Sequence, residues 1–250
     1  MDDIGSPFSQ HKIVILNPKG GSGKTTIATN LATVFAARGP APTLVDCDPG
    51  GYSLRWIEKR PSARPTVHGI AAWDQPGRDE PAPEPNPDSK EVIVDLPAAL
   101  TPSEVFDHVY DASSIVLPIV PSEIDIYAAA RFIADLLLIV QLDRRKLVIV
   151  SNRVRRNTRS YAMLNRFLTS LDIPVIAHLR DSQNFVQASA FGLGIAELPP
   201  SRVREDLAQL DLLVSWLDRW KARQLDAFLK AELGQGREVP AYAQAGSRRH

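Results

Sequence analysis

The chain has 250 residues, 44% of them hydrophobic, which is enough to build the core of one sizeable domain. Its 29 Lys and Arg residues balance its 29 Asp and Glu residues, so any surface for nucleic acid or anionic membranes must come from local charge. Cys47 is the only cysteine, which excludes an intrachain disulfide, and residues 1–10 carry no apolar secretory stretch. We therefore expect a cytoplasmic protein. Every apolar run is shorter than the roughly 18 to 20 residues that cross a bilayer.

Strands and helices are expected to alternate in the first half of the chain. The apolar run 12–16 predicts a strand, and apolar residues at helical spacing predict a helix over 25–38. A short strand at 43–45 and a helix beginning at 54 follow. Prolines at 81, 83, 85 and 87 then predict an extended or disordered loop over 78–89.

The same alternation continues to the last helix. We expect strands at 91–95, 114–120, 146–151 and 173–178, and helices near 103–110, 123–140, 158–170 and 201–233. This pattern predicts an α/β fold, with a mostly parallel sheet and helices on both faces. We expect one domain over 12–233, with flexible ends at 1–11 and 234–250.

The most informative segment lies between the first strand and the first helix, where residues 17–26 read Asn-Pro-Lys-Gly-Gly-Ser-Gly-Lys-Thr-Thr. Glycines in such a loop let successive backbone N–H groups converge on an anion, and the helix adds the positive end of its dipole. The segment thus predicts a P-loop, in which Lys24 reaches the β- and γ-phosphates and Thr25 places its hydroxyl on Mg²⁺. The predicted nucleotide-binding residues of this loop are Gly20, Gly21, Ser22, Gly23, Lys24, Thr25 and Thr26.

Carboxylates and an amide follow the other predicted strands. Ligands of open α/β sheets gather at the carboxyl ends of the strands, so Asp46, Asp48, Asp95 and Asn152 should lie along the edge that holds the loop. Asp95 ends an apolar strand and matches the carboxylate that supports Mg²⁺ in P-loop enzymes. Asp46 ends the strand beside the loop, where its carboxylate could hold an attacking water against the γ-phosphate or, as strand-end aspartates commonly do, organise a turn.

Three motifs resemble those of the ParA/MinD family of deviant Walker-type ATPases, and the chain looks like the small, single-domain ParA type. They are the loop with its second lysine, Lys19, the string from Val45 to Pro49, and the string from Asp95 to Ala98. The chain departs from the family at Gly50, where Gln is usual, and after Pro97.

The resemblance implies roles for individual residues. It implies that Asp46 serves hydrolysis and that Lys19 crosses to the nucleotide of a partner subunit, so that ATP and Mg²⁺ are sandwiched in a homodimer. It also implies that Asp48 and Asp125 lie near the dimer interface and that Asn152 reads adenine.

A basic segment over 144–170 contains eight Lys and Arg residues and no Asp or Glu. Such a segment is suited to neutralising DNA phosphates without reading sequence. The DNA-binding residues predicted on this basis are Arg153, Arg155, Arg156 and Arg159. An exposed helix face, or a contact to the nucleotide or second subunit, is the alternative interpretation.

The resemblance implies an ATPase that coats nucleoid DNA nonspecifically and leaves it after slow hydrolysis, stimulated by a small ParB-like or McdB-like partner protein. The cargo would be a plasmid, a chromosome or a protein organelle such as a carboxysome. Two alternatives stay open, namely a MinD-like protein attached to membranes through its last helix (Trp216 to Lys230) and a P-loop biosynthetic enzyme. An iron-protein-type reductase is disfavoured because Cys47 alone cannot hold a cluster.

Overall fold

A computed structural model describes residues 10–73 and 84–234 of the chain, with side chains described through residue 230. This part forms a seven-stranded sheet in the order β3-β2-β4-β1-β5-β6-β7, and every strand pairs in parallel with its neighbours. The predicted α/β fold is therefore confirmed. The strands are β1 (His11–Ile15), β2 (Thr43–Asp46), β3 (His68–Ala71), β4 (Glu91–Asp95), β5 (Ser114–Ile119), β6 (Leu147–Val154) and β7 (Val175–Arg180).

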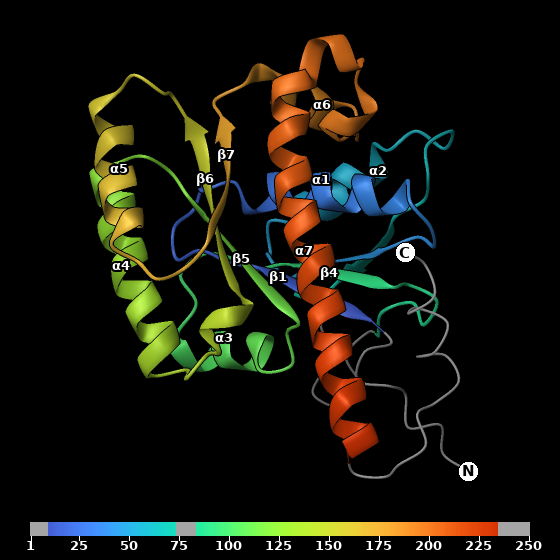
Figure 1. Cartoon of the computed structure of the whole chain (residues 1–250). Helices are drawn as coiled ribbons and strands as arrows, with labels where there is room; N and C mark the ends of the chain where they lie inside the picture. The colour runs from blue at the N-terminus through green and yellow to red at the C-terminus, as the bar shows by residue number, and fades with distance from the viewer. Residues whose placement is uncertain (1–9, 74–83, 235–250) are drawn as a thin grey trace.

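Helices cover both faces of the sheet (Figure 1). One face carries α1 (Lys24–Ala36), α2 (Tyr52–Glu58), α6 (Gln183–Ala190) and α7 (Pro200–Gly234), with the 3₁₀ turn η2 (Ile195–Glu197). The other face carries α3 (Pro102–Val109), α4 (Glu123–Leu138) and α5 (Arg159–Thr169), and the 3₁₀ turn η1 (Arg144–Lys146) leads into β6.

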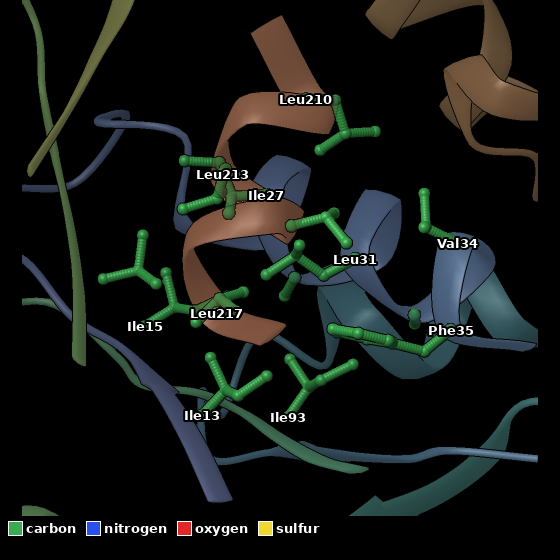
Figure 2. Close-up of a cluster of buried hydrophobic side chains, with 14 of the residues drawn as sticks. Ile13, Ile15, Ile27, Leu31, Val34, Phe35, Ile93, Leu210, Leu213 and Leu217 are labelled. Carbon is green, nitrogen blue, oxygen red and sulfur yellow. The ribbon is translucent and has the colours of Figure 1, made fainter. Parts of the chain in front are cut away.

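The central strand β1 shows why the sheet must be covered twice. Ile13 and Ile15 point into the core beneath α1 and α7, whereas Val14 and Leu16 point into the core beneath α3, α4 and α5. Successive strand residues face opposite sides of a sheet, so a strand apolar at every position buries both faces. Figure 2 shows the first core, where Ile13 and Ile15 meet Ile27 and Leu31 of α1 and Leu213 and Leu217 of α7.

One strand, β3, and one α-helix, α6, were not predicted. β3 reads His-Gly-Ile-Ala, too short and too mixed to signal a strand, and it exists because it pairs with the edge of β2. The amphipathic α6 begins where the Ser182 hydroxyl accepts a hydrogen bond from the Asn184 amide.

The last helix uses its apolar side chains for packing. Leu210, Leu213, Val214 and Leu217 are buried against the sheet, and Trp220 donates its indole N–H to the Ser113 carbonyl at 2.8 Å. Of the apolar side chains from Trp216 to Lys230 on which the membrane interpretation depends, this packing engages Trp216, Leu217 and Trp220. Within the described ranges, no helix is long and apolar enough to cross a membrane.

Several sequence predictions lie outside the described residues. They concern most of the N-terminal segment, much of the proline-rich loop and the C-terminal tail, because residues 1–9, 74–83 and 235–250 are not described. The end of the loop is packed, since Ser89 is buried and donates to the Ala41 carbonyl at 2.6 Å.

Candidate functional site

The predicted phosphate loop connects β1 to α1 at the carboxyl edge of the sheet. Gly21 and Gly23 both have left-handed backbones, with φ of 76° and 96°. A side chain at Gly23 is also excluded by space, because an added Cβ would lie 2.0 Å from Asn152 Nδ2. Asn152 is 5% exposed, and its Nδ2 donates a hydrogen bond to the Ser22 carbonyl at 2.8 Å. Asn152 therefore braces the loop from the end of β6.

Lys24 lies across the inside of the loop. Its Nζ is 3.3 Å from the Lys19 carbonyl and 3.5 Å from the Asn17 carbonyl. Burial lowers the pKa of the Lys24 ammonium, and the carboxylates of Asp95 and Asp48 oppose that shift. An anion held in the loop would supply the compensating charge that this buried cation lacks.

Asp95, at the end of β4, is linked to the loop by a hydrogen bond. Its Oδ2 accepts from the Thr25 hydroxyl at 2.7 Å and from the Ser53 hydroxyl at 2.7 Å. Burial raises the pKa of Asp95 to about 6, although both hydrogen bonds lower it. Thr25 and Asp95, which the sequence predicts as the residues that hold Mg²⁺, are thus hydrogen-bonded to each other.

The residues around Asp95 fit Mg²⁺ bound together with a nucleotide. Among the described residues, three buried side-chain oxygens have no hydrogen-bond partner: Asp95 Oδ1, Ser22 Oγ and Ser151 Oγ. The same residues contain no group of three His, Cys, Asp or Glu side chains that would hold a metal alone. Mg²⁺ is usually bound by one or two side chains plus phosphate oxygens and water, which suits Thr25 and Asp95.

Asp46, at the end of β2, is fully buried and organises the turn after it. Its Oδ2 accepts from the backbone amides of Ser53 at 2.8 Å and Leu54 at 3.1 Å, and its Oδ1 accepts from the Asp48 amide at 3.1 Å. Burial raises the pKa of Asp46, and these three amide bonds oppose the rise. Asp46 therefore stabilises the start of α2 in addition to any role toward water.

Two adjoining cavities open at the loop. The larger, of about 800 Å³, is lined by the loop and by Asp48, Tyr52, Arg55, Trp56, Lys59, Ala98, Arg153 and Ser189. The smaller, of about 430 Å³, shares Thr26, Arg153 and Ser189 with it and includes Asn152 and Arg180. Together they offer a polar cleft that runs from the phosphate loop past the predicted adenine-reading amide.

The structure brings two of the three predicted interface residues, Lys19 and Asp125, together within one chain, whereas the third, Asp48, lines the larger cavity. Lys19 Nζ lies 3.3 Å from Asp125 Oδ1, and the lysine side chain is 35% exposed. Asp125 belongs to the first turn of α4, where Ser122 caps the helix. Lys19 thus stands at the rim of the loop, and Lys24 lies inside it.

The structure also accounts for the departure at Gly50. A Cβ added there would lie 2.4 Å from the ring of Tyr52, which covers this position and is itself 58% exposed at the cavity. A longer residue at position 50 would displace the tyrosine ring, which fills the space beside Gly50 in this chain.

The prediction that the basic residues of 144–170 lie together on one surface is wrong. Strand β6 is eight residues long, or about 26 Å. Arg144 and Arg145 precede this strand, and Arg155, Arg156 and Arg159 follow it. Acidic residues from outside the segment also neutralise several of its members. The ion pairs are Arg144 with Asp172, Arg145 with Asp143, Arg155 with Asp181, and Arg156 with Glu205.

Two of the four predicted DNA-binding arginines make no ion pair with described residues, namely Arg153 and Arg159. Arg153 has a left-handed backbone with φ of 52° and lines both cavities, which favours a contact with the bound nucleotide. Arg159 begins α5 beyond the end of β6.

Sequence reasoning missed Ser53, Tyr52, Trp56 and Ser189 as site residues, because α2 and α6 bring them there through tertiary packing.

A parallel sheet with a glycine loop, a buried Lys24 and the Thr25–Asp95 pair at its carboxyl edge defines a P-loop nucleotide-binding protein. A family model described as "CobQ/CobB/MinD/ParA nucleotide binding domain" matches residues 13–195. The chain belongs to this family and is a ParA/MinD-type ATPase domain.

Individual relatives agree with this assignment. The chain is 30% identical over 221 residues to "Maintenance of carboxysome distribution protein A" of Gloeobacter kilaueensis, covering 87% of this chain and 100% of that protein. It is 27% identical to the protein of the same name from Halothiobacillus neapolitanus, over 66% of this chain and 76% of that one. A putative plasmid partition protein from Borrelia burgdorferi B31, solved with AMPPNP, shares the fold with a TM-score of 0.63 at 12% identity, over 82% of this chain and 99% of that chain.

Proposed function

We propose that this protein is a positioning ATPase that forms an ATP-sandwich dimer, binds nucleoid DNA nonspecifically and distributes a cargo with a partner protein that stimulates slow hydrolysis. The observation that carries the proposal is the loop itself, which holds Lys24 inside and presents a second lysine, Lys19, at its rim. One lysine serves the nucleotide bound by its own chain, and the second is free to serve another chain once it leaves Asp125.

The chain's own residues supply most of what phosphoryl transfer requires. The loop amides and Lys24 would hold the phosphates. Thr25 and Asp95 would hold Mg²⁺, which would neutralise charge on the transferring group. Asp46 orients the attacking water with the accepting capacity that its three amide bonds leave. Lys19 of the partner subunit supplies the cation that an arginine finger supplies in other P-loop enzymes.

Asn152 supports the proposed position of the base. Asn152 contacts the loop and lines the smaller cavity. A nucleotide with its phosphates at the loop would therefore extend its base into that cavity. The proposed DNA-binding surface is narrower than the basic segment of the sequence and comprises Arg155, Arg156 and Arg159, at the end of β6 and the start of α5. The Arg155 and Arg156 side chains stay 76% and 65% exposed, and DNA phosphates would replace their partners Asp181 and Glu205.

The relatives support a protein organelle as the cargo. Two of them are named for carboxysome distribution, and the first is matched over its whole length. The partner protein would then be one that connects this ATPase to the shell of such a body.

The test is binding to random-sequence duplex DNA, at low and moderate salt, with ATP, ADP or no nucleotide. Binding only with ATP, weakened by salt, is the expected result, because phosphate contacts release counterions. The Lys24→Ala variant is the control and should bind DNA in none of the three states. Equal binding by wild type in all three states would refute the nucleotide switch, and no binding in any state would refute the DNA surface.

A further inference from the structure

Ser53 connects the two buried carboxylates of the site and belongs to none of the motifs. It lies in the first turn of α2 and is completely buried. Its backbone amide donates to Asp46 Oδ2 at 2.8 Å, and its hydroxyl donates to Asp95 Oδ2 at 2.7 Å. One residue thus bonds the ends of β2 and β4 through two different groups.

The hydroxyl determines which oxygen of Asp95 is left for other partners. Asp95 Oδ2 accepts from both Ser53 and Thr25, each at 2.7 Å. Asp95 Oδ1 is buried and has no partner among the described residues. Two donors on one oxygen orient the plane of the carboxylate and leave the other oxygen available to a cation or its water.

The backbone that presents Ser53 is itself specialised. Gly51 precedes α2 with a left-handed φ of 63°, and an added Cβ there would meet the ring of Trp73 at 3.3 Å. This turn aims the first amides of α2 back at Asp46 and, with them, the Ser53 hydroxyl at Asp95.

We infer that Ser53 is a positioning residue, whose hydroxyl orients Asp95 for Mg²⁺ and whose amide connects that carboxylate to Asp46. The inference rests on the proposed function, since it assumes a nucleotide site that uses Mg²⁺. Side chains that orient a metal ligand typically change metal affinity about 10- to 100-fold when they are removed.

The Ser53→Ala variant separates the two groups, because it removes the hydroxyl and keeps the amide. We expect the Mg²⁺ concentration that half-saturates the metal's effect on binding of a fluorescent ADP analogue to rise about tenfold. Affinity for the same analogue without Mg²⁺ should change less than about twofold, since Ser53 makes no hydrogen bond to the phosphate loop other than through Asp95. ADP is the probe because it separates metal binding from hydrolysis and dimerisation.

Ser89→Ala is the matched control. Ser89 is also buried next to β2, and its hydroxyl bonds Thr43 at 2.8 Å and the Ala41 carbonyl at 2.6 Å, away from the site. The Ser89→Ala variant should leave the Mg²⁺ dependence of ADP-analogue binding unchanged. If Ser53→Ala does not fold, Ser53→Cys keeps the volume with a much weaker donor and should show the same shift.

The possible outcomes separate the two hypotheses. An unchanged Mg²⁺ half-saturation in a folded Ser53 variant overturns the inference and leaves the proposed function intact. An equal loss of affinity with and without Mg²⁺ also overturns it, because a merely structural role has that effect. If wild type binds no ADP analogue at any Mg²⁺ concentration, the proposed function fails, and the inference fails with it.

Discussion

Replacing Gly23 by alanine tests whether the phosphate loop is held by Asn152. Two costs are expected. A non-glycine residue at φ 96° is strained by about 1 to 3 kcal/mol. The new Cβ would also lie 2.0 Å from Asn152 Nδ2, so the amide must move and give up its 2.8 Å bond to the buried Ser22 carbonyl, at about 1 to 3 kcal/mol. Gly23→Ala should therefore lower the free energy of unfolding by about 2 to 6 kcal/mol.

A double-mutant cycle separates the clash from the strain. Asn152→Ala alone loses the same hydrogen bond, so the double variant should lose it only once. The double variant is then expected to be about 1 to 3 kcal/mol more stable than the sum of the two single changes predicts. Urea unfolding with an unchanged m-value measures each free energy.

Gly20→Ala is the matched control from the same loop. A Cβ at Gly20 meets nothing within 4 Å, and its backbone is not left-handed, so its stability should stay within about 0.5 kcal/mol of wild type. Additive effects of Gly23→Ala and Asn152→Ala, within about 0.5 kcal/mol, would refute the contact on which this prediction depends. A destabilised Gly20→Ala would show that the loss at Gly23 does not depend on the contact with Asn152 alone.

Three further predictions address catalysis, pH and DNA. Asp46→Ala should retain ATP binding and dimerisation but stop turnover, while freeing the Asp48 amide and the Ser53 and Leu54 amides at the start of α2. Undiminished hydrolysis in a steady-state phosphate assay would contradict the role of Asp46. Burial lowers the pKa of His11 to about 3, so the unfolded chain binds a proton that the folded chain excludes. Protonation of His11 in the unfolded chain therefore lowers the free energy of unfolding as pH falls through 6.5, by about 2 kcal/mol at pH 5. Urea unfolding at pH 7 and pH 5 should show that a His11→Gln variant lacks this loss of stability. Neutralising Arg155, Arg156 and Arg159 together should weaken binding to every duplex and reduce the slope of log affinity against log salt by up to about 3. Neutralising Arg144 and Arg145, at the other end of β6, should leave DNA binding unchanged. Equal effects of the two sets would contradict the proposed DNA-binding surface.

Electrostatic contacts from distant segments explain why the predicted basic surface needed correction. Residues 144–170 contain no acid, yet Asp181, Glu205 and Asp172 pair with their arginines from other elements. Glu205 also contacts Arg180, whose neighbour Asp206 is buried. A run of like charges predicts a surface only when nothing from elsewhere in the chain covers it.

The contact between Lys19 and Asp125 is another result of the fold. The resemblance places both residues near a dimer interface, and the structure shows them paired within one chain at 3.3 Å. The lysine would have to exchange this partner for a phosphate, which the sequence does not indicate.

The sequence by itself determined the P-loop, the strands of the sheet's centre and the acids at their ends. These features depend on neighbouring residues, since glycines permit the left-handed turns at Gly21 and Gly23 and continuous apolar runs form buried parallel strands. Only the tertiary structure decided the edge strand β3, the brace from Asn152 to Ser22 and the link through Ser53. Those features depend on contacts between residues 25 to 130 positions apart. Residues so far apart in the chain leave no periodic or local signal in the sequence.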